Sequence, residues 1–230
     1  MAGETVKSRA LCMRIVPWSR TSHVVGWLTP RGRVTTVVKG AVRPKSLFLG
    51  QYDLNYTCEI VYYARARGEL HALRECSPLE TRDALRGDFR ALAAADWCRR
   101  SSWDLAPEGP DAEAWLALAE RTLDALAGRA GASEGALARV LAFEADALKL
   151  AGLAPEIEAE SGAFALRGER RMPVRPEVAR CIQNPLAEKN PQILLDAARA
   201  IGVFYSFHLD CAVESRRAAL SVISQTNKEQ

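Results

Sequence analysis

Five short runs of alternating apolar and polar residues occupy the first 80 positions of this 230-residue chain, with no long helical pattern between most of them. They lie at 11–16, 23–29, 33–38, 55–63 and 69–75. Alternation with a period of two and enrichment in Val, Thr and Tyr predict β-strands. Turn residues separate them at Pro30-Arg31-Gly32 and at Arg67-Gly68. Five strands this short and this close together favour a small barrel over an α/β sheet.

From about residue 81 the sequence becomes rich in Ala, Leu, Arg and Glu at helical spacing, so residues 81–230 are predicted to form an α-helical domain. Helices are expected over Asp83–Trp97, from Pro110-Asp111 to Gly128, from a Ser133 cap to Gly152, near Gln192–Ile201 and near Phe204–Ser224. The Pro-rich stretch 155–192 is expected to be irregular. The fold class is therefore α+β, with a strand-rich domain at 1–80 and a helical domain that carries an insertion.

Charge is divided unevenly along the chain, although the formal net charge is only +3. Residues 1–52 hold nine basic side chains and one acid, a charge of +8, which leaves −5 for the remainder. Clustered Lys and Arg set up a positive field and point to a polyanionic partner. A solvated basic surface without a partner explains the same asymmetry equally well.

Basic and aromatic residues alternate in this first segment, a combination that binds single-stranded nucleic acid by neutralising phosphates and stacking on bases. Trp27 continues a strand and is expected in the core, whereas Trp18 lies at a turn and is expected to be exposed. The cluster around Gly40 and Pro44 is the strongest signal, because cations in such a loop have little reason to be buried. The candidate DNA-binding residues are Arg14, Trp18, Arg20, Arg31, Arg33, Lys39, Arg43 and Lys45.

Local signatures of catalysis, nucleotide binding and metal binding are absent from the sequence. The six cysteines are widely spaced, which is typical of reduced thiols and argues against a structural zinc site. His208 and Cys211 lie near each other in the last predicted helix, but no Asp or Asn is evidently placed to orient them. Residues 1–9 are polar and lack the apolar core of a signal peptide, and no apolar run reaches the length that crosses a bilayer, so we expect neither an export signal nor a membrane span. We expect a cytoplasmic protein without catalytic residues, cofactor, metal or membrane contact.

Several segments, in order, resemble the RecO family of bacterial recombination mediators. The segment "HVVGWLTPRGRVTTVVKGAVRPKS" is similar to the family's stretch ending in Lys-Gly-Ala-x-Arg-x-x-Ser, and "GELHALRE" is similar to its barrel-closing strand. Further on, "RVLAFEADALKLAGLAPEIEA" resembles the helix that precedes a Gly-x-x-Pro-Glu-Leu motif, and "FHLDCAVESRRAAL" resembles the final helix. Together these segments cover most of the chain.

The resemblance implies an N-terminal OB-fold and a helical C-terminal domain. It implies annealing of complementary single strands and loading of RecA onto strands coated by single-stranded DNA-binding protein, with RecR as a partner. Such a protein would be associated with the nucleoid, and double-stranded DNA stays open as a second ligand. The helical domain would engage the acidic, apolar tail of single-stranded DNA-binding protein, with Arg121, Arg129 and Arg139 as candidate cations.

The sequence departs from the family where many members carry two close pairs of cysteines that form a zinc module. The corresponding stretch, residues 158–181, retains only Cys181, so the Pro-rich insertion at about 155–192 stands in place of that module. Two other functions stay open on the sequence. One is a scaffold whose basic barrel binds an acidic protein, and the other is a hydrolase that uses Cys211 and His208.

Overall fold

The computed structural model describes residues 4–65, 70–109, 112–128, 135–158, 162–167, 170–209 and 213–225. The features predicted at Arg67-Gly68, Pro110-Asp111 and Ser133 lie outside these ranges. Two compact units are present. The first holds Met1–Asp83 and Leu105–Arg121, and the second holds Ala84–Asp104 and Thr122–Gln230. The division into domains 1–80 and 81–230 stays a prediction, because both units include parts of the helices that follow the strands.

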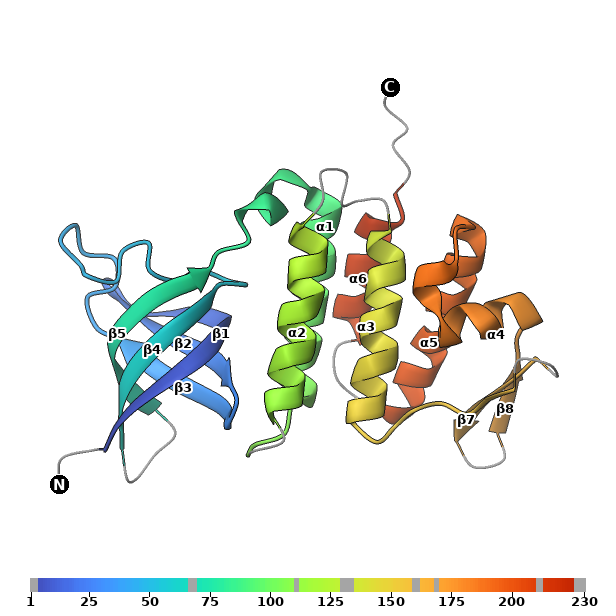
Figure 1. Ribbon diagram of the computed structural model, residues 1–230, viewed down its shortest axis with the longest axis horizontal. Helices are drawn as coiled ribbons and strands as arrows, with labels where there is room; N and C mark the ends of the chain where they lie inside the picture. Colours follow the sequence, from blue (N-terminus) through green and yellow to red (C-terminus); the bar gives the residue numbers. More distant parts are fainter. Residues whose placement is uncertain are drawn as a thin grey trace. The chain divides into compact units, whose positions relative to one another are not determined.

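Five strands close into a barrel, which confirms the predicted strand-rich domain (Figure 1). They are β1 (Glu4–Ser19), β2 (Ser22–Thr29), β3 (Gly32–Val38), β4 (Thr57–Ala64) and β5 (Leu70–Glu80). The order around the barrel is β1-β2-β3-β5-β4, and β1 pairs with β4 to complete the circle. All pairings are antiparallel except that of β3 with β5. This is the five-stranded Greek-key barrel of the OB-fold.

The barrel interior is built around Trp27, which is fully buried as the strand pattern predicted. Its indole Nε1 donates a 2.9 Å hydrogen bond to Thr36 Oγ1 on the neighbouring strand. The only polar atom of the indole is thus paired inside the core, which avoids the cost of a buried donor without an acceptor. Alternate residues of β1, β2 and β4 surround it, among them Cys12, Val25 and Ile60.

The N-terminal half of α2 (Ala112–Ala127) belongs to the same compact unit as the barrel. Glu120 on this helix accepts from Arg9 Nε at 3.0 Å and from Thr57 Oγ1 at 2.8 Å. Arg9 Nη2 lies 2.9 Å from the second carboxylate oxygen, so the ion pair is bidentate. These contacts attach the helix to β1 and β4.

The remaining elements are helical except for one small sheet (Figure 1). The helices are η1 (Asp83–Gly87), α1 (Phe89–Leu105), α3 (Ala136–Leu150), α4 (Pro176–Gln183), η2 (Pro185–Ala187), α5 (Pro191–His208) and α6 (Val213–Ile223). The sheet consists of β6 (Ile157–Glu158), β7 (Ala163–Arg167) and β8 (Arg170–Pro173). No helix in the described part of the chain combines the length and apolar character needed to span a membrane.

The second unit corrects two expectations. The Pro-rich stretch 155–192 is not irregular, because it contains the three-stranded sheet and α4. Prolines there begin helices: Pro176 and Pro191 occupy the first turns of α4 and α5, where no backbone N–H is required. The helices expected near 192–201 and 204–224 also have different limits, because α5 continues through Gly202 to His208.

A buried ion pair joins α3 to α6 in this unit. Arg216 donates through Nε and Nη2 to the two carboxylate oxygens of Glu144, at 2.7 and 2.8 Å. Glu144 is fully buried and also accepts from Trp97 Nε1 at 2.9 Å. A Cβ placed on Gly202 would lie 2.8 Å from Arg216 Nη1, so the glycine inside α5 makes room for the guanidinium.

The Arg216→Ala substitution is expected to destabilise the helical unit by about 3–5 kcal/mol, because it leaves the Glu144 carboxylate buried without its cation. Urea unfolding followed by circular dichroism measures the change. Arg199→Ala is the matched control, since Arg199 pairs with Asp196 at the surface and is 73% exposed. Its loss is expected to cost at most about 1 kcal/mol. Equal effects of the two substitutions would contradict this role of the buried pair.

Candidate nucleic-acid interface

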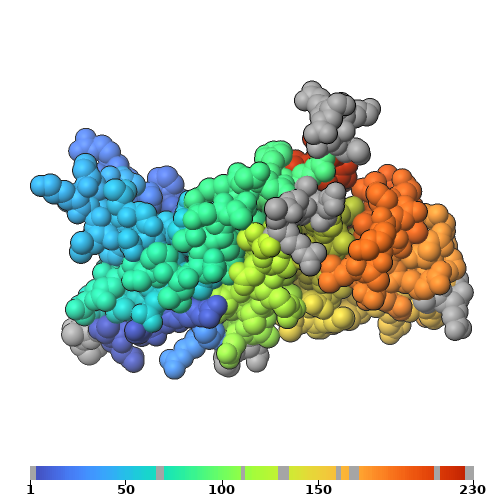
Figure 2. Space-filling model, turned by 45° about the horizontal axis from the view of Figure 1, so that its top comes forward, coloured from blue at the N-terminus to red at the C-terminus, as the bar shows by residue number. Residues whose placement is uncertain are grey.

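The tip of the β1–β2 hairpin and the connection between β3 and β4 lie at the same end of the barrel. Gly40 N donates to Ser22 Oγ at 3.2 Å, and Val42 N donates to the Thr21 carbonyl at 3.3 Å. Both segments project from this end in the space-filling view (Figure 2). We call the surface formed by residues 14–21 and 39–51 the basic end.

The connection is a series of tight turns rather than an open loop. Backbone hydrogen bonds link Arg43 N to Gly40 O, Ser46 N to Arg43 O and Leu49 N to Ser46 O, at 2.9–3.3 Å. Gly40 begins the series with φ of +68°, a conformation that other residues adopt at a cost. Consecutive turns of this kind fix the backbone that carries the cations.

Side chains that point inward anchor the connection to the barrel. Ala41 is buried in the barrel core, and Phe48 and Tyr52 pack against that core. The Tyr52 hydroxyl and His23 Nδ1 lie 2.9 Å apart in a hydrogen bond, and the Trp27 and Tyr52 rings meet edge-on at 6.0 Å. Burial is the main cause of a raised pKa for the Tyr52 phenol, which therefore stays neutral and keeps this hydrogen bond at physiological pH. No local pattern in the sequence indicates this anchor, since His23 and Tyr52 are 29 positions apart.

Five of the eight predicted residues meet at the basic end. Trp18 is 64% exposed at the hairpin tip, as predicted from its turn position. Arg20, Lys39, Arg43 and Lys45 are exposed at the same end of the barrel. A sixth residue, Arg14, is exposed on β1 four positions before Trp18, and the register of β1 with β2 shifts between Pro17 and Ser19.

Arg31 and Arg33 lie at the opposite end of the barrel, in the β2–β3 hairpin. Strand β2 has eight residues from Ser22 to Thr29, so about 23 Å separates its two ends. Arg33 is also paired, with its Nη2 3.1 Å from Glu108 Oε1. The structure therefore does not bring these two arginines together with the other six residues.

Ion pairs account for three of the nine cations of the basic first segment. Lys7 lies 2.8 Å from Glu59, Arg9 is held by Glu120, and Arg33 by Glu108. Within the described ranges, no ion pair is found for Arg20, Lys39, Arg43 or Lys45, all at the basic end. The charge available to a ligand is therefore concentrated there.

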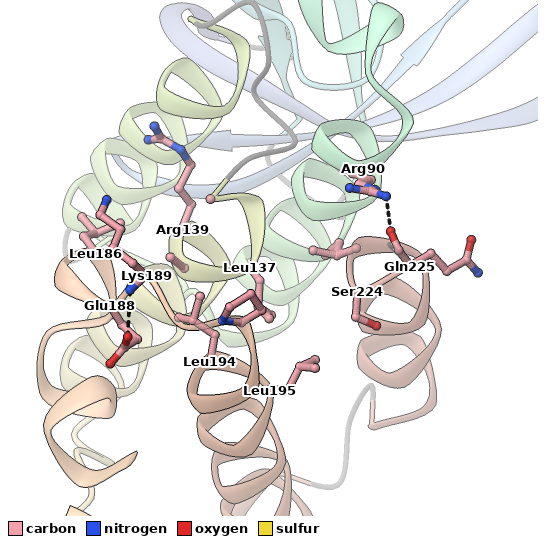
Figure 3. Close-up of a pocket in the computed structure, with 14 residues that line it drawn as sticks. Arg90, Leu137, Arg139, Leu186, Glu188, Lys189, Leu194, Leu195, Ser224 and Gln225 are labelled. Carbon is pink, nitrogen blue, oxygen red and sulfur yellow. Dashed lines mark hydrogen bonds between the residues drawn. The ribbon is translucent and has the colours of Figure 1, made fainter. Parts of the chain in front are cut away.

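A cavity of about 800 Å³ opens in the helical unit (Figure 3). It is lined by the beginnings of α1, α3 and α5, by the segment from η2 to α5, and by the end of α6. Its lining combines leucines with cations, including Leu137, Leu194, Arg139 and Lys189. The Arg90 guanidinium donates a hydrogen bond to the Gln225 carbonyl, just after the end of α6. The Arg139 Nε is buried and has no hydrogen-bond partner among the described residues. A buried donor of this kind is suited to an anionic ligand.

The three candidate partner-binding arginines have different positions. Arg139 lines the cavity, whereas Arg121 is exposed near the middle of α2 and does not line it. Arg129 lies outside the described residues. Arg90 and Lys189 also line the cavity, and sequence reasoning missed them because the lining comes from segments that are far apart in the sequence.

The hydrolase hypothesis gains no support from the described residues. Cys211 lies outside them, and the His208 ring stacks on Phe204 with centroids 4.2 Å apart. The five described cysteines are all buried. The pKa of Cys76 is raised by its hydrogen bond with Cys58 and by burial, and burial raises the pKa of Cys98, so both stay neutral thiols at physiological pH.

Comparison with known proteins identifies the family. No family model matches the chain. The chain is 30% identical to the DNA repair protein RecO of Anaeromyxobacter sp. strain Fw109-5 over 159 residues, which is 68% of this chain and 60% of that relative. RecO proteins of Anaeromyxobacter sp. strain K and of Anaeromyxobacter dehalogenans match at the same identity over 157 residues. The chain belongs to the RecO family. It spans about 60% of the length of these relatives.

The zinc module found in many RecO proteins does not fit this RecO-family chain. Cys181 lies on α4 and is buried. Its pKa is raised to about 11 by burial and by the nearby charge of Glu188, whereas zinc binds the thiolate. No group of three or more His, Cys, Asp or Glu side chains placed to hold a metal occurs within the described ranges. The sheet β6–β8 and α4 occupy this region instead.

The raised pKa predicts that Cys181 reacts slowly with iodoacetamide. At pH 8 a thiol with a pKa of about 11 is thiolate only about one part in 1,000, against roughly a quarter for an unperturbed cysteine. Alkylation of native protein, followed by peptide mass spectrometry, is expected to be about 200-fold slower at Cys181 than in urea. Comparable rates in the two conditions would show that the thiol is neither buried nor protonated.

Proposed function

We propose that this chain binds single-stranded DNA through the basic end of its barrel and acts in DNA repair as a recombination mediator. The observation that carries the proposal is that Arg20, Lys39, Arg43 and Lys45 are all exposed at the end of the barrel that also carries the exposed Trp18. Membership of the RecO family supports the same direction, because the matched relatives are DNA repair proteins.

Binding at this surface would be mainly electrostatic. Each cation that approaches a phosphate releases condensed counterions, which favours binding at low salt. Trp18 offers a flat face for a base, at roughly 1–3 kcal/mol per stacked base and without sequence preference. The turns and the Tyr52 anchor hold the cations in place before DNA arrives, so little ordering is required on binding.

The finer activity we propose is annealing of complementary strands and loading of RecA onto strands coated by single-stranded DNA-binding protein, with RecR as a partner. A strand neutralised by the basic end repels its complement less, so pairing becomes faster. Neither step requires a covalent intermediate or a cofactor. We place this activity in the cytoplasm, at the nucleoid.

The cavity beside α3 is the proposed site for the acidic, apolar tail of single-stranded DNA-binding protein. Its leucines would take apolar side chains, and Arg139, Lys189 and Arg90 would face carboxylates. The Arg139 Nε that lacks a partner among the described residues is the strongest support. An acidic tail would also be attracted over a distance by these cations.

Replacing Lys39, Arg43 and Lys45 with Ala is expected to lower affinity for single-stranded DNA at least several-fold and to flatten its salt dependence. Three lost phosphate contacts reduce the slope of log K against log salt by about 2. Fluorescence anisotropy with a labelled oligonucleotide across a salt series measures both quantities. An annealing assay with complementary oligonucleotides, with and without single-stranded DNA-binding protein, tests the activity.

The charge-matched control is Arg100→Ala, Lys149→Ala and Arg180→Ala, three exposed cations of the helical unit. This variant has the same net charge and should keep most of the salt slope. If the two triple variants behave alike, general attraction rather than the basic end holds DNA. A wild-type protein that binds an acidic protein but no DNA at physiological salt would favour the scaffold function instead.

Arg139→Ala is expected to lower the affinity of the cavity for an acidic peptide with an apolar C-terminal residue by about tenfold or more. The reason is the loss of a charge-assisted hydrogen bond, worth roughly 1.5–3 kcal/mol. Isothermal titration calorimetry with the synthetic peptide measures it. Arg180→Ala, an exposed cation on α4 that does not line the cavity, is the control and should bind like the wild type. Unchanged binding by Arg139→Ala would place the peptide elsewhere.

A further inference from the structure

Two leucine side chains of the basic end are exposed to solvent. Leu47 is 89% exposed and Leu49 is 56% exposed, and both flank Phe48, which packs against the barrel core. Val42, earlier in the same connection, is 46% exposed. Single exposed apolar residues are ordinary in proteins, but a group of them on one ordered segment indicates a binding surface.

The local backbone explains why these leucines stay outside. The turn from Ser46 to Leu49 is closed by a 3.3 Å hydrogen bond, and the turn from Phe48 to Gln51 by one of 3.1 Å. Phe48 points inward from this pair of turns. Ala41, Phe48 and Tyr52 supply the contacts of this connection with the barrel core, and the two leucines are not among them. The side chains of Leu47 and Leu49 therefore contribute little apolar burial to the stability of the folded barrel.

The chemistry around the leucines selects a ligand that is both anionic and apolar. Residues 39–52 contain three cations, Lys39, Arg43 and Lys45, and no acidic residue. The exposed Trp18 lies on the adjoining hairpin tip. An unstacked single strand presents phosphates along one edge and flat apolar bases along the other, which matches this arrangement.

We propose that Leu47 and Leu49 form an apolar wedge that packs against unstacked bases and makes the basic end prefer single strands to intact duplex. The inference rests on the proposed DNA-binding function and adds the residues that set its specificity. Cations attract single strands and duplex alike through phosphates. An apolar wedge enters an unpaired strand without breaking base pairs, whereas a duplex must first unstack a base step, which costs free energy.

The test compares the intact wild-type protein with Leu47→Ser/Leu49→Ser, using single-stranded and double-stranded oligonucleotides of one sequence. In the variant, single-strand affinity should fall about tenfold, since burial of apolar side chains is lost. Duplex affinity and the salt slope should not change. With 2-aminopurine in the single strand, the fluorescence change should be smaller with the leucine variant than with wild-type protein, and the stacking of a base on Trp18 accounts for the part that remains. Leu150→Ser, a leucine that is 43% exposed at the end of α3, is the control.

The outcomes separate the two proposals. Equal losses on both oligonucleotides, or no loss on either, would overturn the wedge while DNA binding by the basic end stands. A wild-type protein without salt-dependent DNA binding would overturn both. If the leucine variant keeps all DNA binding and loses an acidic protein partner, the surface docks protein and the wedge is wrong. Unchanged melting temperature excludes unfolding as the cause of any loss.

Discussion

The antiparallel pairing of β2 with β3 decides where the cations of the first segment lie. Thr29 pairs with Gly32 at one end of this hairpin, and His23 pairs with Val38 at the other. The chain on either side of the pairing, at Arg20 and at Lys39, must therefore emerge at the same end of the barrel. Residues in the hairpin turn, such as Arg31, are fixed about one strand length away. The separation of Arg31 from Arg20 and Lys39 depends on this register.

The β2–β3 register does not by itself determine the conformation of the long β3–β4 connection. Contacts with the barrel core restrict that conformation. The hydrogen bond between Tyr52 and His23 returns the end of the connection to the start of β2. Gly40 and Val42 bind the hairpin tip at its beginning. Because the segment is attached to the barrel at both ends, its cations are held in a defined arrangement before a ligand binds. Pre-organisation of this kind improves binding because less conformational entropy is lost.

Much of this arrangement could be predicted from the sequence, and the missed parts have physical reasons. Alternation located all five strands, and the turn at Pro30-Arg31-Gly32 already implied the β2–β3 hairpin. That hairpin separates Arg31 and Arg33 from Lys39, although all eight residues were predicted as one set. The strands and helix within 155–192 were missed because proline was interpreted as a breaker, while Pro176 begins a helix. Arg90 and Lys189 could not be found, since no local pattern indicates which distant segments line one cavity.

The structure shows which cations of the basic first segment are paired with acids, and the net charge of the segment does not show this. Acids outside the basic first segment meet its cations within the barrel unit: Glu59 holds Lys7, Glu108 holds Arg33 and Glu120 holds Arg9. These pairs attach secondary-structure elements to one another, so part of the positive excess serves folding. The cations of the basic end have no acidic residue near them in the sequence from 39 to 52. The cations at this end of the barrel remain available to a ligand. They lie at the same end as the exposed Trp18 and the two exposed leucines.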